Sequence, residues 1–405
     1  MLLAAVLAGG ACSPTRPPAR TTTTTLAATT TGATTTAPTT TSTTTAPPTT
    51  AGAGCAQRVE AGLSEAQRIG QLFMLGEPLV LPDAATRQAL HDLPVGGVVL
   101  FGRSRSPATA IRALTDRLRA LAGGAPAAAA GVGLFVATDQ EGGQIQNLAG
   151  PGFDAIPSAV VQGMTDPAAL KDDARRWATQ LGLAGVNIDL APVLDVVPPA
   201  FAATNQPIAH FQRQLGDNPA TVASHGAAVV GGFQAAGVGA TVKHFPGLGR
   251  VVGNTDDTAS VADTTTTRHD PSLAAFAAGI HAGARFALVS SATYTQIDPT
   301  HRAVFSSVVM RDMLRGDLGF QGLVLSDDLG AAAQVGDVAP GTRAVDFLAA
   351  GGTVVLAVRP VSVVAPMMAA VQAEAAASAA FRQLVDADAL AVLAAKQAAG
   401  LLFCP

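Results

Sequence analysis

The chain has 405 residues, of which 48% are hydrophobic, and a formal net charge of -4. This composition suits a soluble globular protein with a large core. It argues against a nucleic-acid-binding protein, which normally presents a basic face. Only 4% of the residues are aromatic, so we expect a core built from many small contacts.

Residues 1–12 have the sequence pattern of an export signal. An apolar run, MLLAAVLAGGA, ends in small residues directly before Cys12. This pattern is typical of a bacterial lipoprotein signal, in which the cysteine becomes lipidated, although the positively charged start of a secretory signal is missing. We therefore expect an exported protein that touches the membrane only through a lipid on Cys12, or is secreted.

Residues 13–54 form a low-complexity segment. Between Thr21 and Thr50 there are 19 threonines and no charged residue. Such a segment cannot bury enough apolar surface to fold, and it predicts a disordered tether. The folded domain is then expected over 55–405. Its two cysteines, Cys55 and Cys404, predict a disulfide that joins the ends of this domain, with two free thiols as the alternative.

The body alternates between apolar, β-prone runs and amphipathic helical segments. Ser64 and Gln67 predict a capping box at the start of the first helix. Further helices are expected over 108–121, 221–236, 273–284 and 308–315. The eight predicted strands are 71–75, 97–101, 133–137, 186–190, 238–242, 286–290, 322–325 and 353–357. Eight strand–helix units predict an α/β fold, a single-domain (β/α)8 TIM barrel. A doubly wound open sheet is the alternative, but no Gly-x-Gly-x-x-Gly follows the first strand.

Polar side chains follow several of these strands at the point where each strand ends. Asp139 and Glu141 follow the third strand, Lys243 and His244 the fifth, and Asp327 and Asp328 the seventh. Since barrel enzymes place their chemistry at the C-terminal ends of the strands, these residues predict one active site. Asp189, near the end of the fourth strand, and Asp195, after it, are expected to fix loops by hydrogen bonds.

The chemistry that these residue types favour is glycoside hydrolysis. There is no cluster of His or Cys with metal-ligand spacing, no phosphate-binding motif and no Gly-x-Ser-x-Gly nucleophile elbow. We therefore expect no metal and no cofactor. Two carboxylates, one attacking the anomeric carbon and one protonating the leaving oxygen, suit a sugar substrate.

Three motifs make the sequence similar to glycoside hydrolase family 3. They are Lys243-His244-Phe245-Pro246-Gly247-x-Gly249, Asp139-Gln140-Glu141-Gly142-Gly143 and Ser326-Asp327-Asp328-Leu329. The resemblance spans about residues 58 to 360 and is strongest to the single-domain β-N-acetylhexosaminidase branch. It implies a retaining, exo-acting enzyme that removes terminal GlcNAc from cell-wall glycan fragments, and we expect it to act as a monomer.

The resemblance also implies roles for individual residues. Asp327 matches the family nucleophile. The residues that match those binding the hydroxyls of the terminal sugar are Asp139, Arg213, Lys243 and His244. Charge-assisted hydrogen bonds from such groups suit hydroxyls.

The family's acid/base position differs in this chain. The branch carries Asp-x-His after the Lys-His-Phe-Pro-Gly motif, and the corresponding positions here hold Asn254 and Asp256. A carboxylic acid can serve if its pKa is raised. We therefore assign Asp256 as the acid/base, with Asp257 as the alternative. Two other functions stay open, a family 3 hydrolase of another sugar such as a β-glucosidase, and a glycan-binding lipoprotein without catalysis.

Overall fold

A computed structural model of the chain describes residues 54–79, 84–124 and 131–403. The predicted signal with Cys12, and the predicted tether apart from its last residue, lie outside this range. Within it, we find no helix with both the length and the apolar character needed to span a membrane.

The centre of the fold is a closed barrel of eight parallel strands. In chain order these are β1 (Phe73–Pro78), β2 (Gly97–Phe101), β3 (Phe135–Thr138), β6 (Ile188–Asp189), β7 (Gly239–Phe245), β9 (Phe286–Val289), β12 (Leu323–Asp328) and β13 (Val354–Ala357). Hydrogen bonding closes the ring in the order β1-β13-β12-β9-β7-β6-β3-β2. The predicted (β/α)8 barrel is thereby confirmed, and the open sheet is excluded.

The strands form where the sequence shows short continuous apolar runs. Strand residues such as Phe73, Leu75, Val98 and Leu100 are fully buried, as expected when both faces of a parallel sheet are covered. The first strand begins two residues later than predicted. The preceding helix α2 (Glu65–Gln71), which starts with the expected Ser64–Gln67 capping box, continues through Gln71.

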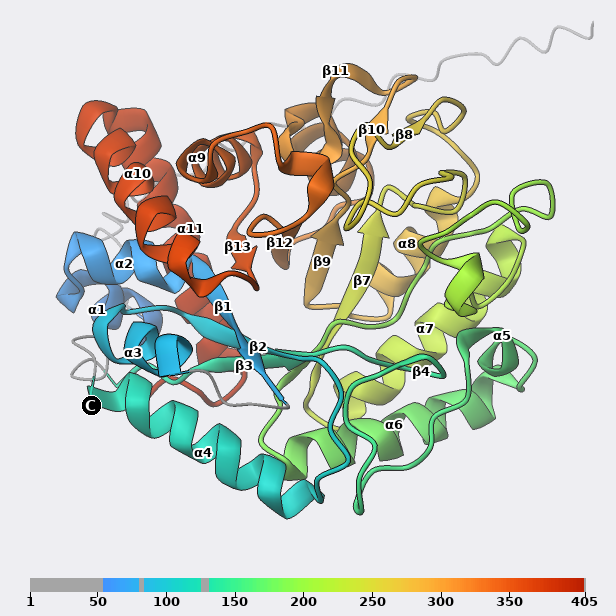
Figure 1. Cartoon of the computed structure of the whole chain (residues 1–405), viewed down its shortest axis with the longest axis horizontal. Coiled ribbons are helices and arrows are strands. Elements are labelled where there is room, and N and C mark those ends of the chain that lie inside the picture. Colours follow the sequence, from blue (N-terminus) through green and yellow to red (C-terminus); the bar gives the residue numbers. More distant parts are fainter. Residues whose placement is uncertain (1–53, 80–83, 125–130, 404–405) are drawn as a thin grey trace, which may run out of the picture. The chain divides into compact units, whose positions relative to one another are not determined.

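Helices surround the barrel and connect its strands (Figure 1). Those in the strand connections are α3 (Ala84–Asp92), α4 (Ala108–Gly124), α5 (Ala159–Gln162), α6 (Pro167–Leu183), α7 (Pro219–Ala235), α8 (Leu273–His281), η4 (Val308–Asp317) and α9 (Pro340–Ala350). After the last strand come α10 (Val364–Ala377) and α11 (Ala379–Ala398). The four helices expected after the first one correspond to α4, α7, α8 and η4.

Two small sheets are inserted after barrel strands. The hairpin of β4 (Gln140–Gly142) and β5 (Ile145–Gln146) follows β3 directly. A second sheet joins β8 (Ala262–Asp263), β10 (Thr293–Tyr294) and β11 (Asp298–Arg302). Short helical turns complete these connections: η2 (Ala209–Phe211), η3 (Ala303–Phe305), η5 (Ala333–Val335) and η6 (Val361–Val363). These insertions build the rim of the barrel that carries the polar residues.

The two described ends of the domain lie together. Helix α1 (Cys55–Gly62) shares a small apolar cluster with α11 and with Leu402 near the C-terminus. Cys55 is disulfide-bonded. Its predicted partner, Cys404, lies outside the described residues, so the pairing of Cys55 with Cys404 stays a prediction.

Candidate active site

The end of β3 supplies two carboxylates to the rim. Asp139 follows the strand directly, and Glu141 lies in the β4–β5 hairpin. The hairpin turns at Gly142 and Gly143, which both have positive φ, and a Cβ on Gly142 would lie only 2.3 Å from the carbonyl oxygen of Pro157. Glycine is therefore required for the turn that holds Glu141 in place.

Strand β7 supplies Lys243 and His244, which are both buried. Lys243 Nζ lies 2.6 Å from Asp139 Oδ1 and 2.7 Å from Glu141 Oε1. Burial opposes the charge on Lys243, but the charges of Asp139 and Glu141 outweigh it and raise the lysine's pKa. The ammonium group therefore stays charged between two carboxylates.

Arg213 reaches the same carboxylate from the loop between β6 and α7. Its Nε and Nη2 donate to the two oxygens of Glu141 at 2.8 and 2.7 Å, a bidentate geometry that fixes the guanidinium plane. Burial opposes the ionisation of Glu141, but Arg213 and Lys243 together lower its pKa to about 2. Glu141 is thus the central anion between two cations.

His244 joins this network through both ring nitrogens. Nδ1 lies 2.7 Å from Asp195 Oδ2, and Nε2 lies 3.3 Å from Arg213 Nη2. Asp195 is fully buried and also accepts the backbone N–H of Leu248 at 2.7 Å. One carboxylate therefore positions the imidazole and the loop that follows β7.

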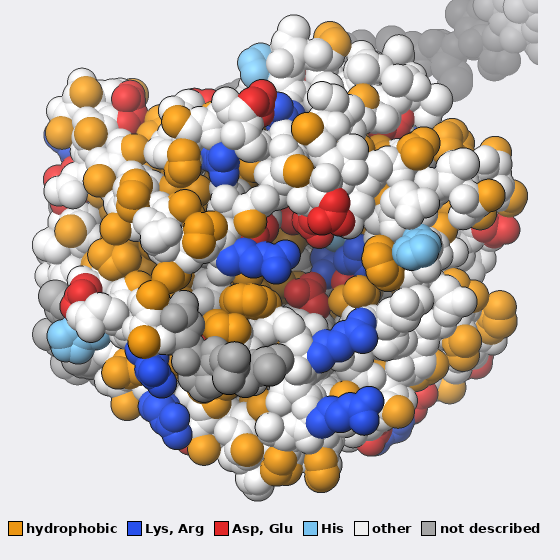
Figure 2. Space-filling model, in the orientation of Figure 1, with side chains coloured by type: hydrophobic (Ala, Val, Ile, Leu, Met, Phe, Trp, Pro, Cys, Tyr) orange, Lys and Arg blue, Asp and Glu red, His pale blue; other side chains and the backbone are white. Residues whose placement is uncertain are grey.

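These side chains line a pocket of ≈ 400 Å³ at the C-terminal ends of the strands. Figure 2 shows a hollow near the centre of this face, with acidic side chains inside it and Lys or Arg side chains in and around it. Apolar residues, among them Phe101, Leu190 and Leu248, complete the walls. Buried charges beside apolar walls suit a ligand that presents hydroxyl groups and a carbon ring.

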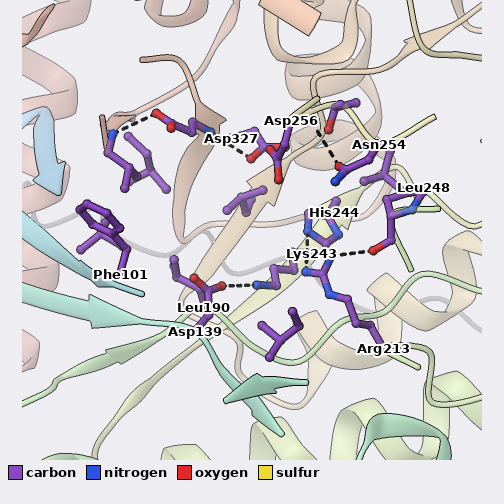
Figure 3. Close-up of a pocket in the computed structure, with 18 of the residues that line it drawn as sticks. Phe101, Asp139, Leu190, Arg213, Lys243, His244, Leu248, Asn254, Asp256 and Asp327 are labelled. Atoms are coloured by element: carbon purple, nitrogen blue, oxygen red, sulfur yellow. Dashed lines mark hydrogen bonds and ion pairs between the residues drawn. The ribbon is translucent and has the colours of Figure 1, made fainter. Parts of the chain in front are cut away.

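Asp327 and Asp256 lie at one side of this pocket, across from Asp139 and Arg213 (Figure 3). Asp327 is near the end of β12, and Asp256 is in the loop after β7. Backbone hydrogen bonds tie the two segments together, because Gln334 N donates to Thr255 O and Ala333 N donates to Asp256 O. Burial, and then the negative charge of Asp256, raise the pKa of Asp327 to about 6.

The structure separates Asp256 from the alternative, Asp257. Asp256 lines the pocket, whereas Asp257 is not among the lining residues. The side chain of Asn254 contacts both residues. Its Oδ1 accepts the backbone N–H of Asp256 at 3.2 Å, and its Nδ2 donates to Asp257 Oδ2 at 3.3 Å. The geometry therefore favours Asp256 as the group that faces a bound substrate.

All six predicted site residues lie in one pocket. Sequence reasoning placed Glu141 at the rim but gave it no role, although its position two residues after Asp139 was a usable signal. It also expected only loop fixing from Asp195 and Asp189. Asp189 does accept the backbone N–H of Gln140 at 3.0 Å, but Asp195 additionally positions His244. The six are Asp139, Arg213, Lys243, His244, Asp256 and Asp327.

Among the residues that the structure describes, no group of three or more His, Cys, Asp or Glu side chains is arranged to hold a metal ion. Instead, Glu141 and Asp139 form ion pairs with Arg213 and Lys243.

A (β/α)8 barrel with carboxylates on opposite sides of a rim pocket places the protein in the class of barrel enzymes. Comparison with known proteins narrows this class. The pattern of the glycosyl hydrolase family 3 N-terminal domain matches residues 65–395. The chain belongs to this family and is therefore a glycoside hydrolase.

Individual relatives agree with this membership. The chain is 35% identical over 315 residues to a β-hexosaminidase of Xanthomonas campestris pv. campestris, covering 76% of this chain and 90% of that protein. The crystal structure of a β-N-acetylhexosaminidase from Beutenbergia cavernae is 48% identical, with a TM-score of 0.79 over 83% of this chain and 99% of that one. A family 3 β-N-acetylglucosaminidase from a Paenibacillus species is 27% identical, with a TM-score of 0.73 over 84% of this chain and 63% of that one.

Proposed function

We propose that this protein is a retaining, exo-acting β-N-acetylhexosaminidase that hydrolyses terminal GlcNAc from cell-wall glycan fragments. One observation carries the proposal: Asp327 and Asp256 lie together in a pocket whose opposite side holds the Asp139–Lys243–Glu141–Arg213 network. The β-N-acetylhexosaminidase relatives support the choice of sugar.

The reaction assigned to this geometry has two steps. Asp327 attacks the anomeric carbon while Asp256 gives its proton to the leaving oxygen, which forms a glycosyl-enzyme ester on Asp327. Asp256, now ionised, then takes a proton from water, which attacks the same carbon and releases the sugar with its original configuration. The two carboxylates must hold one proton between them at the start, and the reactive form carries it on Asp256.

The network on the opposite side holds the terminal sugar. Asp139 accepts hydrogen bonds from hydroxyls, while Lys243, Arg213 and the His244 ring contribute polar atoms fixed by their other partners. Because these groups are already held in position, little side-chain entropy is lost on binding. A pocket of ≈ 400 Å³ supports the binding of a terminal residue.

The proposal extends to the place of action. Lipidation at Cys12 and a tether over residues 13–54 would hold a monomeric enzyme at the outer face of the cell membrane, where glycan fragments of the cell wall arise. The apolar run before Cys12 and the threonine-rich tether support this arrangement. Labelling of cells with a radioactive fatty acid tests it, since Cys12→Ala should abolish incorporation into the protein.

The activity is tested with two aryl substrates. We expect faster hydrolysis of an aryl N-acetyl-β-glucosaminide than of the matching β-glucoside, and loss of turnover in Asp327→Ala. Faster glucoside turnover would instead assign a β-glucosidase. Sugar binding by calorimetry without any turnover would identify a glycan-binding protein.

The acid/base assignment has its own test. Asp256→Asn should slow hydrolysis most for poor leaving groups, and azide should restore its rate through a glycosyl azide product of retained configuration. Asp257→Asn is the matched control, since it removes the neighbouring charge without touching the pocket. Azide rescue of Asp257→Asn alone would reverse the assignment.

A further inference from the structure

The segment that carries Asp256 is an exposed loop between two buried ends. Residues 256–260 are exposed, whereas Thr255 and Val261 on either side of them are buried. Holding such a loop in one shape costs conformational entropy. Because Asp256 is the proposed acid/base, the contacts that fix the two ends of the loop also restrict the position of its carboxylate.

Both ends of this loop are bonded to the same residue, Gln334 in η5. The backbone N–H of Gln334 donates to Thr255 O at 3.1 Å. The side chain reaches the other end of the loop, where Oε1 accepts the N–H of Val261 at 2.7 Å and Nε2 donates to Val261 O at 3.0 Å. Gln334 is only 1% exposed. Three hydrogen bonds from one buried residue therefore close the loop at its base.

The same residue joins the loop to the segment of the proposed nucleophile. Helix η5 begins five residues after β12, which carries Asp327, and the N–H of Ala333 in η5 donates to Asp256 O at 3.0 Å. A glutamine side chain suits this place because its amide both donates and accepts. An apolar side chain of the same length would leave the buried N–H of Val261 without its acceptor, which is costly.

We propose that Gln334 is a positioning residue, which holds the carboxylate of Asp256 in place relative to Asp327 by closing the loop that carries it. The inference rests on the proposed function. Proton transfer to the leaving oxygen depends on the placement of the acid. The placement matters most for a poor leaving group, which needs the proton, and least for one that departs as a stable anion. A general loss of stability would not distinguish the two.

The test compares two aryl N-acetyl-β-glucosaminides, one that releases dinitrophenol and one that releases phenol. The ratio of kcat/KM for the phenyl substrate to that for the dinitrophenyl substrate measures the use of the acid, because kcat/KM reports the step in which the leaving oxygen departs. Gln334→Met keeps an unbranched side chain of similar length and removes the amide. We expect it to lower this ratio roughly tenfold.

Gln146→Met is the matched control. Gln146 is also buried and also binds the backbone through both ends of its amide. Its Nε2 donates to Leu148 O and Asp154 O, and its Oε1 accepts the N–H of Ile156. Because these bonds do not involve the loop of Asp256, this variant should lose stability in urea and keep the wild-type ratio.

Two further measurements complete the design. Gln334→Asn keeps the amide on a shorter side chain, so it should lower the ratio in the same direction and serves if Gln334→Met does not fold. Deuterium exchange of the Val261 amide should be faster in Gln334→Met than in the wild type. Unchanged exchange, or an equal loss with both substrates, would overturn the inference. Absence of turnover of either substrate by the wild type would instead overturn the proposed function.

Discussion

The Nδ1 atom of His244 lies 2.7 Å from Oδ2 of Asp195. This contact orients the imidazole ring and helps to set its tautomer. On the other side of the ring, Nε2 lies 3.3 Å from Arg213 Nη2. Because a guanidinium only donates hydrogen bonds, Nε2 is the acceptor and Nδ1 carries the hydrogen that Asp195 accepts. Arg213 therefore donates to both Glu141 and His244, and His244 in turn donates to Asp195.

The first prediction concerns Asp195→Asn. An amide places an N–H₂ group against either the His244 ring or the Leu248 N–H, which both need an acceptor. We expect kcat/KM on aryl N-acetyl-β-glucosaminide to fall about 10- to 100-fold, as for other residues that orient a functional histidine. The matched control is Asp298→Asn, a carboxylate with several hydrogen bonds outside the pocket. It should reduce stability in urea but not kcat/KM, and equal activity losses in the two variants would contradict the positioning role.

The second prediction concerns the pH profile. Burial and the charge of Asp256 raise the pKa of Asp327 to about 6, so the two carboxylates lose their last shared proton near this pH. The reaction needs that proton for the leaving oxygen, so the kcat/KM of the wild type should fall as the pH rises above about 6. Asp256→Asn leaves Asp327 without the neighbouring charge, so this variant should lose the basic limb and keep only an acidic limb below about pH 6. An activated aryl leaving group, which needs no protonation, keeps this variant measurable.

Asp257→Asn serves as the control for this profile. Its carboxylate is bonded to Asn254 rather than placed in the pocket. We expect its basic limb to stay within a few tenths of a pH unit of the wild type. If Asp257→Asn shifts the limb and Asp256→Asn does not, Asp257 is the charge that Asp327 senses.

Most of the barrel could be predicted because its strands are short apolar runs that end in polar residues. The predicted start of β1 is too early because Gln71 directly precedes the apolar run that begins at Leu72, whereas in three dimensions it completes the helix capped by Ser64. The local sequence pattern does not show whether a boundary residue belongs to the helix or to the adjoining strand.

Most site residues are predicted from strand ends, and Arg213 and Asp256 from the family resemblance, but the pairing within the site is not. That Glu141 lies between Arg213 and Lys243 depends on three segments that are far apart in the chain. The choice of Asp256 rather than Asp257 also depends on tertiary contacts. The backbone hydrogen bonds of Thr255 and Asp256 to the segment after β12 decide which carboxylate faces the pocket. Sequence neighbours with the same chemistry can be separated only by such tertiary contacts.

The third prediction concerns Glu141→Gln, which leaves two buried cations with a neutral partner. We expect a loss of roughly 3–5 kcal/mol in the free energy of unfolding, together with a higher KM, because Arg213 loses its carboxylate partner and Lys243 keeps only Asp139. Urea unfolding and steady-state kinetics measure the two effects. The control is Asp154→Asn, which removes exposed ion-pair contacts with Arg176 and should change both quantities little.

The same substitution should change the dependence of stability on pH. The pKa of Glu141 is about 2 in the folded protein and about 4.3 when unfolded. Its contribution is therefore present above about pH 4.3 and is lost as the pH falls towards 2. In Glu141→Gln the free energy of unfolding should depend less on pH between about 2 and 4.3. An unchanged dependence in this range would show that Glu141 is not the group that titrates.

The last prediction concerns Lys396, a buried residue of α11 far along the chain from the catalytic motifs. Its Nζ donates to Gln71 Oε1 at 2.6 Å and lies 5.1 Å from the centre of the Phe135 ring. Burial lowers its pKa to about 7, below the value of about 10.4 for an unfolded chain. Between these pH values the unfolded state binds more protons than the folded state, so stability should rise with pH.

Lys396→Met, which keeps an unbranched chain of similar length, should remove this rise. We expect a smaller increase in the free energy of unfolding from pH 7 to pH 10 than in the wild type, measured by urea unfolding at several pH values. At pH 10 the variant should be the less stable protein, because Gln71 loses its donor; at pH 6 removal of the buried charge offsets that loss. Lys171→Met, at an exposed site on α6, is the matched control and should keep the wild-type slope. A slope in Lys396→Met that equals this control would show that the ammonium group gains compensating solvation in the folded protein.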